Sequence, residues 1–165
     1  MLAVKDATVL IHLAKISLLE KSCVHFKKVI IPKLVYKEVR KGIEKGYADA
    51  VVVVDAVKRK LISIKKARGR LVRKCNSFSI YGGEAEAVAL YWQEKASILA
   101  TDDDNVRKKA AIISVNVAGT PAILLKLVEK GYISKEKFKE SVSELRKVGW
   151  FSDAVLDKAL MEGLK

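Results

Sequence analysis

Short apolar segments alternate with longer segments of helical periodicity along this chain, and this alternation constrains the fold more than any other feature. Strand-like segments are expected at residues 3–5, 28–31, 61–64, 97–101 and 114–118. The helical segments between them are expected at residues 8–20, 33–45, 47–57, 83–95 and 104–111. Strands that alternate with helices form parallel sheets with helices on both faces. The sequence therefore predicts an α/β fold of three layers, α/β/α, around a central parallel sheet of about four to five strands.

Three further helices are expected in the last part of the chain, at residues 120–130, 134–148 and 152–164. Gly131 and Gly149 separate them, and Ser134 and Ser152 stand at positions typical of helix N-caps. The chain has 165 residues, half of them hydrophobic, which suits one folded domain. It contains no linker, internal repeat or low-complexity tract. We therefore expect a single domain over residues 1–165.

The net charge of +13 indicates a polyanionic partner. Nucleic acid is the favoured partner, and an anionic membrane surface is the alternative partner. A lysine-rich surface that is merely solvated, without a partner, is the other alternative. Residues 58–74 are dense in positive charge and contain no acidic and no aromatic residue. Phosphate contacts are expected here rather than base stacking, with a solvated face as the alternative. The candidate nucleic-acid-binding residues are Arg68, Arg70, Arg73 and Lys74.

Several of the few acidic residues stand at strand ends or within apolar helical patterns. Asp6 and Asp102 follow expected strands, and Glu38 borders the apolar stripe of its helix. Each has a structural alternative, such as capping a helix or pairing with a neighbouring lysine. Carboxylates gathered at one edge of a sheet nevertheless repel one another and favour a hard cation, Mg²⁺ or Mn²⁺. The full set of candidates is Asp6, Glu38, Glu84, Glu86, Asp102 and Asp104.

Four motifs follow one another in a recognisable order: DATVLIHL, PKLVYKEV, GGEAEAVAL and ILATDDDNVRKKA. Together they resemble the PIN-domain nucleases, especially the compact prokaryotic and archaeal members that include toxin-like ribonucleases. The later segment GTPAILLKLVEKGYIS is similar to the same subgroup. The resemblance covers residues 2–133, which implies a PIN-like core there and additional C-terminal helices over residues 134–165.

The resemblance also implies which residues form the site. Glu, rather than the usual Asp, stands at the third acidic position. The glutamate pair and the aspartate triplet leave open which member of each binds metal directly. By resemblance, the catalytic and metal-binding set is Asp6, Glu38, Glu84 and Asp102, with Glu86 and Asp104 as further ligands and Thr8 in support.

The function implied is that of a Mg²⁺- or Mn²⁺-dependent endoribonuclease, which hydrolyses single-stranded or loop RNA to products with 5′-phosphate and 3′-hydroxyl ends. Members of this family act as toxins neutralised by a protein antitoxin or in RNA processing, and they commonly form homodimers. RNA, an antitoxin and a second copy of the chain are therefore the expected partners. One alternative is a non-catalytic RNA-binding protein on the same scaffold. Another is a toprim-like nucleic-acid enzyme, which would use Asp102 and Asp104 but need neither Asp6 nor Glu38.

Other kinds of chemistry find little support in the sequence. Cys23 and Cys75 lack a metal-ligand spacing and are expected to be reduced. His12 lies in an apolar helical segment, where a packed histidine is expected, and no histidine can be assigned as a general base. There is no phosphate-binding glycine loop and no serine or cysteine nucleophile motif. Without a signal peptide or a sufficiently long apolar run, we expect a cytoplasmic protein that does not enter membranes.

Overall fold

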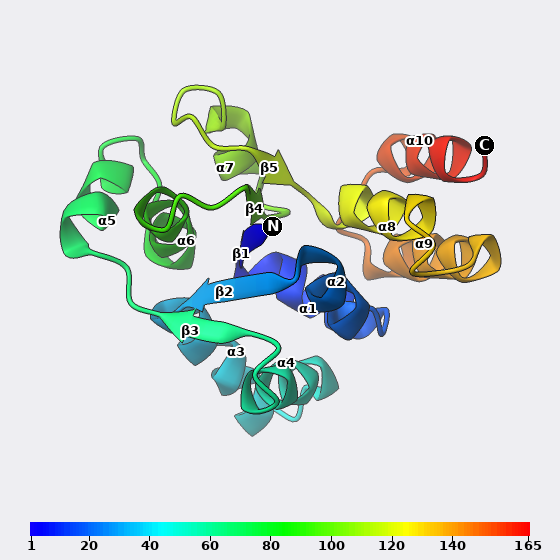
Figure 1. Cartoon of the computed structure of the whole chain (residues 1–165), viewed down its shortest axis with the longest axis horizontal. Coiled ribbons are helices and arrows are strands. Elements are labelled where there is room, and N and C mark those ends of the chain that lie inside the picture. Colours follow the sequence, from blue (N-terminus) through cyan, green and yellow to red (C-terminus); the bar gives the residue numbers. More distant parts are fainter.

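The computed structural model describes all 165 residues and contains five strands and ten helices (Figure 1). The strands are β1 (Leu2–Lys5), β2 (Lys28–Pro32), β3 (Ser63–Lys65), β4 (Ile98–Ala100) and β5 (Val117–Ala118). The helices are α1 (Ala7–Lys15), α2 (Leu19–Phe26), α3 (Lys33–Glu44), α4 (Ala48–Lys58), α5 (Gly69–Asn76), α6 (Gly82–Gln93), α7 (Asp104–Lys109), α8 (Thr120–Glu129), α9 (Lys135–Val148) and α10 (Asp153–Gly163).

All strands are parallel, in the order β3-β2-β1-β4-β5, with β1 at the centre. The chain adds β2 and β3 on one side of β1 and then crosses over to add β4 and β5 on the other. In the register of β1 and β4, Lys5 pairs with Ala100, so that Asp6 and Thr101 are the next residues beyond the two strands. A reversal of strand order of this kind leaves a crevice at the carboxyl ends of the strands. The topology therefore positions Asp6 and Asp102 at the switch point of the sheet.

The two faces of the sheet are covered by different helices, as Figure 1 shows. On one face Ala3 and Ile31 pack with α1–α4 and with the C-terminal helices α8–α10. On the other face Val4 and Ile30 pack with α5, α6 and α7. Because neighbouring strand residues point to opposite faces, a strand buried on both sides is apolar throughout. The predicted three-layer fold with a parallel sheet of four to five strands and extra C-terminal helices is confirmed.

Two segments differ from the expected elements. The helix expected at residues 8–20 is two helices, because Ser17 adopts a left-handed conformation with φ of 59°. The Leu18 amide donates to the Leu13 carbonyl at 2.9 Å and closes the end of α1. Within the basic segment, residues 69–76 form α5, a helix that was not expected from the sequence; its apolar residues Leu71 and Val72 pack toward α6.

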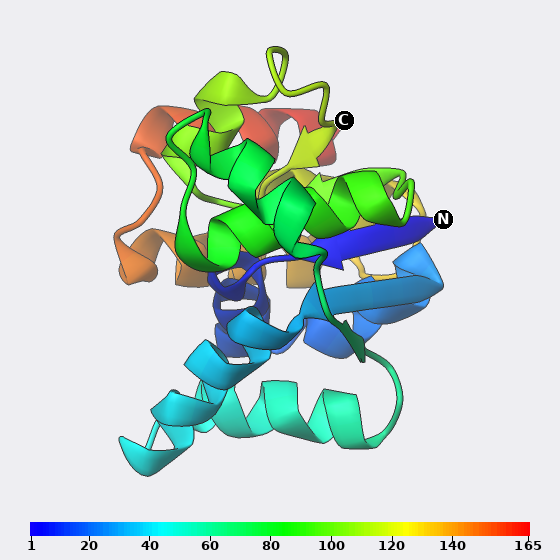
Figure 2. The same ribbon diagram turned by 90° about the vertical axis from the view of Figure 1, so that its left-hand side faces the viewer.

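The C-terminal helices begin and end within one residue of the expected bounds. The side chains of Ser134 and Ser152 accept hydrogen bonds from the amides of Lys137 and Val155, and Gly149 ends α9 with φ of 75°. In Figure 2 the connection between α9 and α10 lies on the side toward which β1 and β2 run, away from the N-terminus. The C-terminal part thereby approaches the carboxyl edge of the sheet. None of the ten helices combines the length and the apolar character that crossing a bilayer requires.

Candidate carboxylate site

Asp6 is held at the carboxyl end of β1 by the first turn of α1. It is the N-cap of that helix, and its Oδ1 accepts hydrogen bonds from the Val9 amide at 3.2 Å and the Thr8 hydroxyl at 2.7 Å. Its Oδ2 accepts a hydrogen bond from the Thr101 hydroxyl at the end of β4. The residue is only 3% exposed. Burial and the nearby charge of Asp102 together raise the pKa of Asp6 to about 6, and burial is the larger cause.

Asp102 is held at the end of β4 from the opposite side. Its Oδ1 accepts the Thr120 amide at 2.7 Å, and its Oδ2 accepts the Thr120 hydroxyl at 2.5 Å. His12 Nδ1 lies 2.7 Å from Oδ2 and donates its proton, since a carboxylate oxygen only accepts. Asp102 is 4% exposed and makes no salt bridge with lysine or arginine. The carboxylate is therefore held by neutral donors and by a histidine.

Thr8 connects these two carboxylates. Its hydroxyl donates to Asp6 and accepts the backbone amide of Asp102 at 3.1 Å. Thr8 and His12 are four residues apart and lie on one side of α1, so this single helix reaches both aspartates. Two side chains of α1 therefore hold the aspartates that follow β1 and β4.

Three glutamates from α3 and α6 form a second group. Glu38 is largely exposed, but partial burial and the negative charges of Glu84 and Glu86 raise its pKa, and partial burial is the largest cause. A Cβ atom on Gly83 would lie 2.9 Å from Glu38 Oε2, so the lack of a side chain there lets the carboxylate approach the start of α6. Glu86 Oε2 accepts the Leu34 amide at 3.1 Å and caps the first turn of α3. Glu84 makes no such hydrogen bond, which leaves its carboxylate available to a ligand.

The aspartate triplet separates into three different environments. Asp102 is buried, as described above. Asp103 is the N-cap of α7 and accepts the Val106 amide at 2.9 Å, so its role is structural. Asp104 is exposed and lines a cavity that it shares with Asp102 and Arg107.

The candidate carboxylates make no salt bridge with lysine or arginine. None of Asp6, Glu38, Glu84 and Glu86 makes a salt bridge, although the chain has 32 lysine and arginine residues. As the side chains stand, no three Asp, Glu, His or Cys residues are close enough together to surround one metal ion. The structure thus brings Asp6 next to Asp102, and Glu38 next to Glu84 and Glu86, as two groups on the elements that border the switch point.

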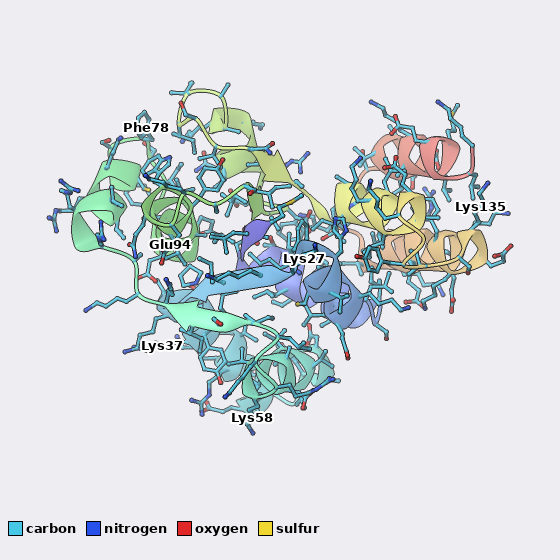
Figure 3. All side chains as sticks on the ribbon, viewed as in Figure 1. Lys27, Lys37, Lys58, Phe78, Glu94 and Lys135 are labelled. Atoms are coloured by element: carbon cyan, nitrogen blue, oxygen red, sulfur yellow. The ribbon has the colours of Figure 1, made fainter.

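The candidate phosphate-binding cations lie on and next to α5. Arg68, Arg70, Arg73 and Lys74 are exposed, and none of them makes a salt bridge. Lys74 Nζ lies 4.8 Å from the ring centroid of Trp92 on α6. Lysines also point outward elsewhere, as Figure 3 shows for Lys37, Lys58 and Lys135. The positive charge of α5 is therefore distinguished by its position beside α6, whose first turn carries Glu84.

Sequence reasoning missed several residues that hold the aspartates. His12 is buried, as expected of a packed histidine, but it also bonds Asp102. Its spacing from Thr8 was a usable signal. Thr101 and Thr120 gave no comparable signal, because a threonine at a strand or helix end is common. Trp150, whose indole N–H donates to the Asp102 carbonyl at 3.1 Å, lies 48 residues away and could be placed only by the fold.

Comparison with known families agrees with this geometry. A family model described as a PIN domain matches residues 2–163, nearly the whole chain. No curated protein and no solved structure matches the chain significantly.

Proposed function

The chain belongs to the PIN-domain family, whose members are generally nucleases, and from this premise we propose that it is a metal-dependent endoribonuclease acting on single-stranded or loop RNA. The observation that carries the proposal is the set of carboxylates at the switch point, none of which makes a salt bridge with lysine or arginine in a protein of net charge +13. Such a site attracts a divalent cation, while the positive surface attracts a polyanion. The same activity would serve a toxin with a protein antitoxin or an RNA-processing enzyme.

The donor set fits Mg²⁺ or Mn²⁺. All candidate ligands are carboxylate oxygens, which these hard cations prefer, and neither cysteine lies among them. Mg²⁺ is usually held by one or two carboxylates and completes its shell with waters and substrate phosphates. Two small carboxylate groups therefore suit it without a cage of three protein ligands. The residues that would hold one or two such ions are Asp6 and Asp102 in one group and Glu38 and Glu84 in the other. Asp104 lies nearby, and Glu86 is mainly engaged in capping α3.

The protein's part in the reaction follows from how firmly it holds these groups. A bound divalent cation supplies an activated water and offsets the charge of the scissile phosphate. Thr8, Thr101 and Thr120 hold the two aspartates in fixed orientations, so little reorganisation is needed when substrate binds. Burial is the main cause of the raised pKa values of Asp6 and Glu38, and a bound cation would offset the cost of ionising these carboxylates.

Cleavage of a mixed-sequence RNA with Mg²⁺ or Mn²⁺ and with EDTA tests the proposal. We expect cleavage only with metal, 5′-phosphate ends on the products, and losses of at least about a hundredfold in Asp6→Asn and Asp102→Asn. Asp103→Asn is the matched control, because it removes one charge next to Asp102 while asparagine still caps α7. RNA that is bound but not cleaved would favour the non-catalytic alternative. Full activity of Asp6→Asn would overturn the assignment of the site.

A further inference from the structure

A cavity of about 450 Å³ opens beside Asp102, where α7, α8 and the connection between α9 and α10 meet. This volume lies in the range of pockets that hold small organic groups. One part of its lining is charged and the other is apolar, which suits a ligand with both an anionic and a flat apolar part. The residues that matter for its chemistry are Asp102, Asp104, Arg107, Trp150, Phe151 and Val155.

Trp150 is an aromatic residue that is both fixed and accessible. Its indole N–H donates to the Asp102 carbonyl at 3.1 Å, yet the residue remains 54% exposed. The rings of His12 and Trp150 have centroids 5.4 Å apart and are tilted by 59°. The hydrogen bond and the neighbouring ring hold the indole without covering it. Ligand binding therefore costs little further conformational entropy of this side chain. An exposed ring held in this way can stack on another flat ring.

Arg107 supplies a positive charge to the same cavity, which Asp102 and Asp104 also line. It is exposed and makes no salt bridge. A Cβ atom on Gly119 would lie 2.5 Å from Arg107 Nη1 and 2.8 Å from Asp102 Oδ1. The absence of a side chain at Gly119 therefore leaves room for the Arg107 guanidinium beside the Asp102 carboxylate. A guanidinium in this place is suited to a phosphate oxygen.

We propose that this cavity is a nucleoside subsite, in which one base of a single-stranded RNA stacks on Trp150 while Arg107 contacts an adjacent phosphate. This inference rests on the proposed nuclease function and names the part of the substrate that would bind between α7, α8 and the α9–α10 connection. It also provides the stacking surface that residues 58–74 lack. Because every base has a flat face, the subsite is expected to accept any base but to require an unpaired one.

Tryptophan fluorescence gives a direct test, since the chain has only two tryptophans. In the Trp92→Phe protein, Trp150 is the only tryptophan that emits. We expect titration with a short single-stranded RNA of mixed sequence, in EDTA to prevent cleavage, to quench this emission. The same strand annealed into a duplex should quench it much less, because its bases are already stacked and paired.

A double-mutant cycle then assigns the contact to a base. An abasic nucleotide is moved along the RNA one position at a time, and affinity is measured for wild type and Trp150→Ala. For the intact RNA we expect Trp150→Ala to weaken binding by about 5- to 150-fold, the range measured for base–aromatic stacking. At one abasic position the two proteins should bind almost equally. Trp150→Phe, which loses the indole N–H but keeps a flat ring, should retain most of the affinity.

Met161→Ala is the control, because Met161 is exposed on α10 at 73% but does not line this cavity. Its affinity for RNA should equal that of wild type. RNA binding of normal strength with no change in Trp150 emission would overturn the subsite and leave the nuclease proposal standing. A Trp150→Ala effect that is the same at every abasic position would also overturn it. Absence of any RNA binding by wild type would overturn the nuclease proposal and the subsite together.

Discussion

Burial controls the ionisation of two consecutive residues, Lys5 and Asp6, at the end of the central strand. Asp6 is surrounded by hydrogen-bond donors, but burial outweighs them and raises its pKa from 3.8 to about 6. In the folded, metal-free protein the ionised form of Asp6 is therefore disfavoured relative to the unfolded chain. The contribution of Asp6 to folding stability is therefore lost as pH rises from about 4 through 6. A salt-bridged aspartate shows the opposite dependence, because its contribution is lost as pH falls.

Asp6→Asn should consequently stabilise the metal-free protein at neutral pH. A pKa raised from 3.8 to about 6 corresponds to at most about 3 kcal/mol in the free energy of unfolding. Urea denaturation of both proteins in EDTA, at acidic, mildly acidic and neutral pH, measures the effect. We expect the difference between variant and wild type to grow through this range. A difference that does not change with pH would show that the carboxylate is not desolvated.

Lys5 is a fully buried lysine without a carboxylate partner. Its ammonium contacts the Ser22 hydroxyl, lies 4.0 Å from Cys23 Sγ and lies 5.3 Å from the ring centroid of Phe26. Burial lowers its pKa from 10.5 to about 8. Below pH 8 the folded protein therefore carries the cost of a buried charge, and stability should rise between pH 8 and about 10 as the unfolded chain retains more protons.

Replacing this lysine by methionine should remove that cost. Lys5→Met is expected to raise the free energy of unfolding at pH 7 by up to about 3 kcal/mol, and the gain should shrink as pH rises above 8. Ser22 keeps a partner in the variant, because its hydroxyl donates to the Leu19 carbonyl at 2.7 Å. Denaturation from neutral to alkaline pH measures the gain. Lys28→Met, at an exposed position of β2, is the control and should show no such pH-dependent gain.

At the scale of single elements, α5 offers the sharpest test of the basic surface. Neutralising Arg68, Arg70 and Arg73 with glutamine should weaken RNA binding for all sequences about equally, since phosphate contacts do not read bases. The slope of log affinity against log salt should fall by ~0.7 for each phosphate that the variant no longer neutralises, or up to ~2 for all three arginines. The measurement is RNA affinity across a salt series in EDTA.

A change of net charge must be separated from the removal of specific phosphate-binding groups. Lys135, Lys139 and Lys158 are exposed on α9 and α10, so their replacement by glutamine makes the same change in net charge elsewhere. We expect the salt slope of this second variant to stay close to that of wild type. Equal effects in both variants would mean that RNA responds to overall charge and that α5 is a solvated face.

The elements themselves were largely predictable, because hydrophobic periodicity and caps are local signals. Ser134, Ser152 and Gly149 act where the sequence indicated. The break after α1 was not predictable, because a serine in the left-handed conformation is uncommon and apolar residues continue at helical spacing through Leu19. The helix α5 was obscured by its charges, since only a narrow apolar stripe remains to mark it.

At the scale of the whole molecule, the parallel sheet brings residues that are far apart in the sequence to one edge, at the carboxyl ends of the strands. Register alone places Asp6 and Thr101 side by side, and the packing of α8–α10 brings the α9–α10 connection to the same edge. Strand-end carboxylates were therefore predictable from the order of elements. The partners of each carboxylate were not, because contacts such as those of His12 and Trp150 with Asp102 depend on how helices pack across the sheet.

Metal binding should stabilise the whole fold, because an ion that binds only the native state lowers its free energy by mass action. At a concentration about a hundred times the dissociation constant, the gain is about 2.7 kcal/mol, or roughly 5–10 °C in Tm for a chain of this size. We expect Mn²⁺ and Mg²⁺ to raise Tm and EDTA to reverse the change. Sodium chloride at equal ionic strength should reproduce little of it, because general screening does not require a site.

The Tm response should depend on the buried aspartates and not on acidic charge as such. The double variant Asp6→Asn/Asp102→Asn should lose most of the metal-dependent rise. Asp49→Asn/Asp55→Asn, which removes two charges from α4, should keep it in full. Without metal, the Asp6→Asn/Asp102→Asn variant should also have a higher Tm than wild type at neutral pH, since the buried charge of Asp6 is gone. A rise in Tm of equal size in both double variants would mean that the cation binds elsewhere on the surface and that Asp6 and Asp102 are not its ligands.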